Sequence, residues 1–238
     1  MPKLVLIVLL ALAYFWWSGD KATVKVPDSD ISFDYIVRYS GDASKSDELP
    51  MVVALHGNGD TAGNFYKTAL NEIEADARII IFKAPIPMGT GGAWPMEAGE
   101  LDRYAEALTD AVDIVYEEYP TFGDPLVVGF SGGGVMSYYL AAAFPDSYSY
   151  IFPVSGMLKK DSLDGLSTEG SKTVEVLAFH GKNDRVVKIS GGRRATELLR
   201  ERGIKIDFQE FEGNHHGLFT NMKEEISDLI SEKIRESY

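Results

Sequence analysis

Ser131 is the side chain whose surroundings in the sequence most clearly point to chemistry. It lies in a G-x-S-x-G pattern, GFSGG at residues 129–133, between an apolar run at 126–128 and a helix-like segment at 135–144. Glycines two residues before and after a serine let strand and helix approach closely around a strained turn, which presents the hydroxyl to a cleft. The pattern predicts a nucleophilic serine. The alternative is a plain glycine-rich turn or a phosphate-binding turn, although no G-x-x-x-x-G-K-[ST] pattern supports a nucleotide loop.

A second glycine-rich turn, HGNGD at residues 56–60, follows the apolar run at 51–55. Acyl transfer to a serine requires two N–H donors for the developing oxyanion, and each is worth about 3 kcal/mol when it is removed. We expect the backbone N–H groups of Asn58 and Gly132 to supply them. We expect His56 to shape the loop by hydrogen bonding, not to act as the base.

An acid and a histidine follow two later strands. Asp184 lies in HGKNDRVV (180–187), after the apolar run at 176–179, and GNHHGL (213–218) follows the last predicted strand. The chain order is therefore Ser131, Asp184, His216, and serine–acid–histidine is the order of the α/β-hydrolase arrangement. The alternative for Asp184 is a turn or helix-capping residue. His215 is the competing choice for the histidine.

The elements that must position these residues alternate along the chain. Five short apolar runs are typical of strands buried on both faces of a parallel sheet, and they lie at residues 51–55, 79–82, 126–128, 150–154 and 176–179. Helix-period stripes lie between and after them, at residues 65–77, 101–115, 198–199 and 222–234. Residues 31–39 and 204–208 alternate, which indicates strands nearer an edge. We predict a mostly parallel α/β sheet with helices on both faces and an antiparallel N-terminal edge.

Composition excludes several other classes of protein. The 238 residues carry 36 acidic and 23 basic side chains, for a net charge of −13, and there is no cysteine. An acidic chain is a poor partner for nucleic acid, and a chain without cysteine has no disulfide, thiolate metal site or cysteine nucleophile. There is no H-E-x-x-H pattern either. We therefore predict an enzyme that needs no metal or other cofactor and has no nucleic-acid partner.

The N-terminus differs from the rest of the chain. Met1-Pro2-Lys3 is followed by 14 consecutive apolar residues, 4–17, which end in four aromatic residues. A short basic start and an apolar run of this length predict a secretory signal peptide or an uncleaved membrane anchor over residues 1–20, with a hydrolase domain over 21–238. The domain would then lie outside the cytosol, periplasmic, extracellular or attached to the membrane through residues 4–17. The alternative is a buried N-terminal helix.

Four motifs together resemble a known family. LHGNGDTAG (55–63), GFSGGG (129–134), HGKNDRVV and GNHHGL are similar to the phospholipase/carboxylesterase group of α/β-hydrolases, which includes the acyl-protein thioesterases, with dienelactone-hydrolase-like esterases close by. The resemblance runs from about Val52 to Leu218. It implies the α/β-hydrolase fold, a triad of Ser131, Asp184 and His216, and an oxyanion hole from Asn58 and Gly132. The thioesterases usually carry glutamine where this chain has Gly132.

The predicted triad indicates a serine esterase that cleaves carboxylic esters. No large insertion follows the strand predicted at 150–154, so we expect small or medium acyl or aryl groups and not bulk lipid. A thioesterase, a peptidase and a non-catalytic binding protein on the same scaffold are the alternatives. Residues 84–98 form a Pro/Gly-rich segment in which Met88, Met96 and Trp94 could line the substrate pocket, unless the loop only packs on its own tryptophan. Arg193 and Arg194 could meet a substrate carboxylate, although a solvated helix face is the simpler interpretation.

Overall fold

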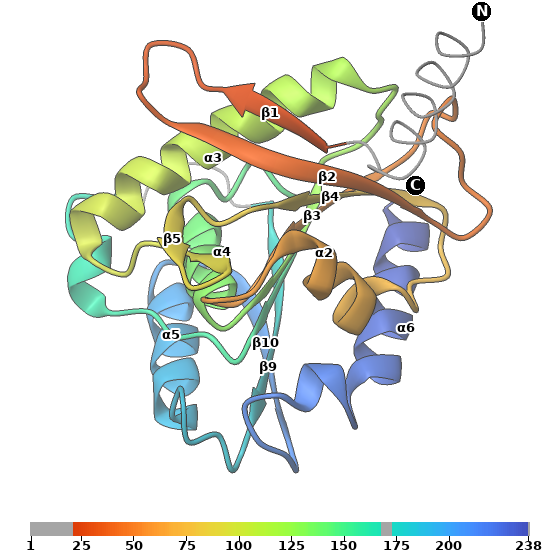
Figure 1. Ribbon diagram of the computed structural model, residues 1–238. Helices are drawn as coiled ribbons and strands as arrows, with labels where there is room; N and C mark the ends of the chain where they lie inside the picture. Colours follow the sequence, from red (N-terminus) through yellow and green to blue (C-terminus); the bar gives the residue numbers. More distant parts are fainter. Residues whose placement is uncertain (1–20, 168–172, 238) are drawn as a thin grey trace, which may run out of the picture.

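The computed structural model describes residues 21–167 and 173–237, so the predicted signal peptide or anchor lies outside the described residues. Its centre is an eight-stranded sheet in the order β1-β2-β4-β3-β7-β8-β9-β10 (Figure 1). The first two pairs, β1–β2 and β2–β4, are antiparallel, and the other pairs are parallel. The strands are β1 (Lys21–Lys25), β2 (Ser32–Ser40), β3 (Met51–Leu55), β4 (Ala77–Phe82), β7 (Leu126–Phe130), β8 (Tyr150–Val154), β9 (Glu175–Gly181) and β10 (Lys205–Phe211).

Helices cover both faces of this sheet. One face carries α3 (Ala98–Glu118), α4 (Gly132–Ala143) and α5 (Ile189–Glu201), and the other carries α2 (Ala62–Phe65) and α6 (Lys223–Glu236) (Figure 1). Short helical turns follow α2 (η1, Tyr66–Leu70), precede β9 (η2, Lys160–Leu163) and precede α6 (η3, Gly217–Phe219). Among the described residues, none of these helices has the length and apolarity needed to cross a bilayer.

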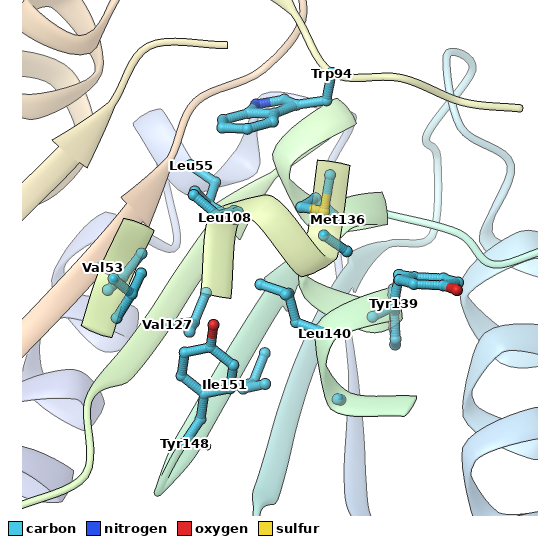
Figure 2. Packing of buried hydrophobic residues seen from close by; sticks show 14 of the residues in the cluster. Val53, Leu55, Trp94, Leu108, Val127, Met136, Tyr139, Leu140, Tyr148 and Ile151 are labelled. Carbon is cyan, nitrogen blue, oxygen red and sulfur yellow. The ribbon is translucent and has the colours of Figure 1, made fainter. Parts of the chain in front are cut away.

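Alternate side chains of the buried strands enter two separate cores. From β3, Val53 and Leu55 pack with Leu108 and Leu140 of the helices on one face (Figure 2). Val52 of the same strand points to the opposite face, where α2 and α6 supply the apolar partners. A strand that is apolar at every position is therefore stable here because both of its faces are covered. The predicted sheet, with helices on both faces and an antiparallel N-terminal edge, is confirmed.

Two local differences from the sequence prediction lie near the site. The helical stripe expected to reach residue 77 ends at Leu70, and Ala77 is instead the first residue of β4. The segment 84–98, expected as a loop, contains a two-stranded hairpin of β5 (Ile86–Met88) and β6 (Gly91–Ala93). Gly92 of β6 exchanges backbone hydrogen bonds with the HGNGD turn, accepting from Gly59 N–H at 2.8 Å and donating to Asp60 O at 3.1 Å. The hairpin therefore holds the turn in place.

Candidate active site

Ser131 occupies a strained turn between β7 and α4. Its backbone lies at φ 54° and ψ −111°, in the left-handed region that most side chains avoid. The turn is tight because a Cβ atom on Gly129 would collide with the Gly133 carbonyl, and one on Gly133 would collide with the Leu55 carbonyl of β3. The glycines of the G-x-S-x-G pattern are thus required by close backbone approach, as the sequence predicted. Strain of this kind persists where the surroundings force it and is concentrated at functional sites.

The ends of three different strands bring Ser131, Asp184 and His215 together. His215 Nε2 lies 3.0 Å from Ser131 Oγ, and His215 Nδ1 lies 2.7 Å from Asp184 Oδ2. The other oxygen of Asp184 accepts the backbone N–H groups of Val186 and Val187 at 2.8 and 2.9 Å. A carboxylate held in this way fixes the tautomer with the proton on His215 Nδ1, which leaves Nε2 to accept the serine proton.

The choice of His216 as the histidine of the triad was wrong by one position. His216 is exposed, and its ring lies perpendicular to that of His215, with the ring centroids 5.2 Å apart. In the tight turn after β10, neighbouring side chains point in different directions. His215 points inward and packs on the ring of Phe130 at 4.9 Å, whereas the His216 backbone N–H is bound by Asn214 Oδ1 at 2.9 Å. Counting along GNHHGL could not reveal which ring faces inward.

The HGNGD turn is fixed against the serine turn by several contacts. His56 is buried, and its Nε2 accepts the Ala84 N–H at 3.0 Å while Nδ1 lies 2.8 Å from the Gly57 carbonyl. These two bonds match the loop-shaping role predicted for His56, and burial lowers the pKa of this imidazole below its ordinary value. Gly132 is the first residue of α4, so its N–H has no partner within the helix.

An open cleft of about 750 Å³ contains Ser131 and His215. Apolar side chains form much of its wall, and polar side chains line the rest. The apolar group is Met88, Met96, Phe130, Val135, Val186, Val187 and Phe219, and the polar group is Asn58, Asp60, Asn64, Thr68 and His216.

Of the three residues predicted for the pocket wall, Met88 and Met96 line the cleft and Trp94 does not. Trp94 is 1% exposed, and its Nε1–H donates to the His56 carbonyl at 2.8 Å (its ring lies in the core in Figure 2). A buried indole N–H requires an acceptor, and the turn after β3 supplies one. Trp94 therefore supports the HGNGD turn from within the core, and its prediction as a wall residue was wrong.

The sequence analysis missed five of the seven apolar residues that line the cleft, among them Phe130 and Val186. Phe130 is the variable residue before the serine, and Val186 follows Asp184 in the same loop, so their positions within two motifs were the available signal. Met88 and Val186 are also two of the three large apolar side chains that are well exposed in the described residues, at 50% and 67%; the third is Ile86 at 41%. Exposed apolar surface is thus concentrated at the mouth of the cleft.

Arg193 and Arg194 are engaged in ion pairs on the surface of α5. Arg193 Nε lies 2.6 Å from Glu210, and Arg194 pairs with Glu197 at 3.0 Å. This is the solvated helix face given as the simpler interpretation. The described residues contain no group of three histidine, aspartate or glutamate side chains placed to hold a metal ion.

The fold and site define an α/β-hydrolase with a serine, histidine and aspartate in contact. The profile of the phospholipase/carboxylesterase family matches residues 98–234, more than half of the chain. The chain therefore belongs to the phospholipase/carboxylesterase family of α/β-hydrolases.

Several proteins that are similar to this chain are esterases. A probable feruloyl esterase C of Aspergillus terreus is 28% identical over 180 residues, which is 72% of this chain and 63% of the relative. Feruloyl esterase C of Emericella nidulans is 28% identical over 169 residues, 67% of this chain and 57% of the relative. Lysophospholipase-like protein 1 of Mus musculus is 25% identical over 57% of this chain and 58% of the relative. The matches thus span about 60% of the length of these relatives.

Solved structures agree with the fold. A carboxylesterase from Mesorhizobium loti superposes with a TM-score of 0.72 at 15% identity, covering 91% of this chain and 99% of its own. A carboxylesterase from Bacillus cereus gives a TM-score of 0.68 at 14% identity, covering 87% of this chain and 95% of its own. At this level of identity the likeness establishes the α/β-hydrolase architecture.

Proposed function

We propose that the protein is a serine esterase that hydrolyses carboxylic esters through Ser131, His215 and Asp184. The observation that supports this proposal most strongly is the pair of contacts on one imidazole, 3.0 Å to the serine oxygen and 2.7 Å to the aspartate oxygen. These distances lie in the range that proton transfer requires. The family supports the same activity, since its name and its esterase relatives describe ester hydrolysis.

In the proposed mechanism, Ser131 Oγ attacks the ester carbonyl while His215 Nε2 takes its proton. Asp184 stabilises the resulting imidazolium, and His215 then gives the proton to the departing alcohol oxygen. This leaves an acyl group on Ser131. Water, activated by the same imidazole, attacks the acyl-enzyme and releases the acid.

The backbone N–H groups of Asn58 and Gly132 are our proposal for the oxyanion hole. Both residues line the cleft beside Ser131, and the Gly132 N–H lies at the N-terminus of α4, where the helix dipole favours negative charge. The Asn58 side chain is held by the Trp94 backbone N–H, which Asn58 Oδ1 accepts at 2.9 Å. A preorganised donor pair of this kind stabilises the oxyanion without reorganisation during the reaction.

The apolar wall supports a small or medium acyl or aryl group as the acid part of the substrate. Met88 and Met96 are flexible, polarisable side chains that adapt to aromatic or aliphatic surfaces. The names of two relatives, feruloyl esterases, point to an aromatic acid for those proteins. The same wall could take a thioester, and the related name acyl-protein thioesterase keeps that alternative in the test.

Rates with a matched panel of substrates test the proposal. We expect p-nitrophenyl butyrate and methyl cinnamates to be hydrolysed, with much lower rates for the matching thioester and no detectable cleavage of the matching anilide. Anilide cleavage as fast as ester cleavage would indicate a peptidase. A panel without any turnover would indicate a binding protein.

We also propose that the domain works outside the cytosol. The basic and apolar N-terminus supports this, and one relative, from Arthroderma benhamiae, is described as a secreted protein. Protease added to intact cells that express the full chain tests it. Digestion of the domain supports export or external anchoring, and protection of the domain until the cells are lysed contradicts it.

A further inference from the structure

A second, smaller hollow of about 420 Å³ adjoins the catalytic cleft. The two share Val186, His215 and His216, and the remaining lining of the smaller one is Asn183, Arg185 and Asn214. We call this hollow the polar groove. Its lining comes from the loop after β9 and the turn after β10, the two segments that carry the acid and the base of the proposed triad.

The proposed mechanism determines which part of the substrate can reach the polar groove. His215 must deliver a proton to the oxygen of the departing alcohol, so that oxygen lies beside this imidazole. The carbonyl oxygen is turned the other way, toward Asn58 and Gly132. Since His215 and His216 line the polar groove, the alcohol part of the ester extends into it, and the acyl part is left to the apolar wall.

Arg185 gives the polar groove a positive charge. It is exposed and has no hydrogen bond or ion pair within the described part of the chain, whereas Arg193 and Arg194 are paired with glutamates. The adjacent Asp184 does not neutralise it by contact, because its carboxylate is buried and bound by backbone N–H groups and His215. Among the described residues, no aspartate or glutamate lines the groove, although the protein carries a net charge of −13.

Neutral hydrogen-bond donors accompany this charge. Asn214 Oδ1 is occupied by the His216 backbone N–H, so its Nδ2 is the group left for a ligand. Asn183 is exposed, and its side chain has no hydrogen bond within the described residues. The main cleft contains a negative charge instead, because Asp60 lines it, with its Oδ1 bound by Thr61 N–H and Asn64 Nδ2.

We propose, building on the ester hydrolase function proposed above, that the polar groove binds the alcohol part of the ester and selects alcohols that carry a negative charge. Arg185 pairs with a carboxylate or a phosphate group on the alcohol, and Asn183 and Asn214 donate hydrogen bonds to it. The overall reaction takes one water and releases the free acid and the anionic alcohol, whose oxygen leaves with the proton from His215.

Two matched butanoyl esters test this selection. Butanoyl glycolate carries a carboxylate on the alcohol, and butanoyl glycolamide is its neutral counterpart of similar shape. We expect kcat/KM to favour the anionic ester roughly fivefold, in line with one exposed charge pair, and the preference to shrink in 0.5 M NaCl. The butanoyl ester of 2-hydroxyethyl phosphate provides the phosphate arm. The anionic ester with the higher kcat/KM shows whether the polar groove prefers a carboxylate or a phosphate on the alcohol.

The variant Arg185→Gln tests whether the Arg185 side chain causes the preference for the anionic ester. This substitution should bring the kcat/KM ratio of the anionic and neutral esters to about one, and Arg185→Lys should retain part of the preference. Arg194→Gln is the matched control, because Arg194 is a partly exposed arginine outside the cleft whose removal should leave the ratio unchanged.

Three results would overturn the proposal. The first is equal kcat/KM for the anionic and neutral esters in the unaltered protein. The second is a preference that Arg185→Gln does not change. The third, hydrolysis of none of the esters, would reject the ester hydrolase function itself and this inference with it. Turnover of both esters without preference would reject the inference alone.

Discussion

The carboxamide of Asn58 occupies the space that a side chain on Gly132 would need. A Cβ atom at position 132 would collide with Asn58 Oδ1, and this oxygen is held in place by the Trp94 backbone N–H. The Asn58 side chain therefore couples the positions of the two proposed oxyanion donors, the backbone N–H groups of Asn58 and Gly132. This relationship explains why the chain carries glycine at position 132.

We predict that Gly132→Ala will lower kcat/KM for p-nitrophenyl butyrate by about a hundredfold, the effect of losing one oxyanion donor. The added methyl group must displace Asn58 or tilt the start of α4, and either movement disturbs the donor pair. Steady-state kinetics measure the loss, and thermal unfolding checks that the protein is folded. The double variant Gly132→Ala with Asn58→Ala removes the collision and should recover part of the rate. A single variant as active as the unaltered protein would show that the two residues are not coupled.

The apolar rim gives a separate prediction for the acyl group. Met88→Ser should raise KM for long or aromatic acyl groups severalfold while leaving Tm within about 1 °C, because a half-exposed side chain contributes little to stability. Ile86→Ser is the matched control, since Ile86 is exposed on the same hairpin but does not line the cleft. Equal effects of the two substitutions would exclude a specific acyl contact at Met88.

The buried histidines His56 and His180 determine part of the pH dependence of the protein's stability. Burial lowers the pKa of both His56 and His180 below the ordinary value of 6.5. His180 Nε2 lies 2.8 Å from the Val187 carbonyl and 3.4 Å from Asp184 Oδ2. Its buried Nδ1 has no hydrogen-bond partner among the described residues, so a second proton would be placed there without an acceptor. The unfolded chain takes up protons below pH 6.5 before the folded protein does. The free-energy contribution of these neutral imidazoles is therefore complete above pH 6.5 and is lost as the pH falls toward their folded-state pKa values.

Urea unfolding at pH 7.5 and pH 5.5 measures this contribution. The decrease in the free energy of unfolding between the two pH values should be smaller in His180→Gln than in the unaltered protein, because the variant lacks one of the groups that titrate. NMR titration provides the direct check, with the rings of His56 and His180 titrating below the ordinary pKa of 6.5 in the folded protein. Protonation of both rings above pH 6.5 in the folded protein would reverse the sign and contradict the prediction.

The fold could be predicted from the sequence because one physical requirement, the burial of apolar side chains, determines both the apolar pattern of the strands and the layered architecture. Strands that are apolar at every position require cover on both faces, and β3 shows this directly, with Val52 and Val53 in different cores. The motif residues Ser131 and Asp184 could also be located, since each directly follows a strand and the carboxyl ends of parallel strands lie at one edge of the sheet.

The remaining errors concern the direction of single side chains. His215 and His216 have the same chemistry and adjacent positions, and only the turn after β10 determines which ring meets Ser131. Trp94 lies in a Pro/Gly-rich segment that suggested an exposed wall, but its N–H acceptor is the His56 carbonyl inside the fold. Such directions depend on contacts with segments distant in the chain, and local patterns do not contain them.

The two histidines can be separated by substitution. His215→Ala should lower kcat by about a million-fold, because Ser131 would lose its base, whereas His216→Ala should stay within about tenfold of the unaltered protein. Ester hydrolysis under steady-state conditions measures both, with unfolding curves to confirm that both variants fold. Comparable mild losses would show that neither ring is the base, and a severe loss only in His216→Ala would restore the original assignment.

Covalent labelling by a fluorophosphonate probe tests the central claim most directly, because such a probe modifies only an activated serine. The protein is labelled, digested and examined by mass spectrometry to map the modified residue. We predict a single modification at Ser131 that is absent from Ser131→Ala and strongly reduced in His215→Ala. No labelling of the folded protein, or labelling at another serine that persists in Ser131→Ala, would contradict the account.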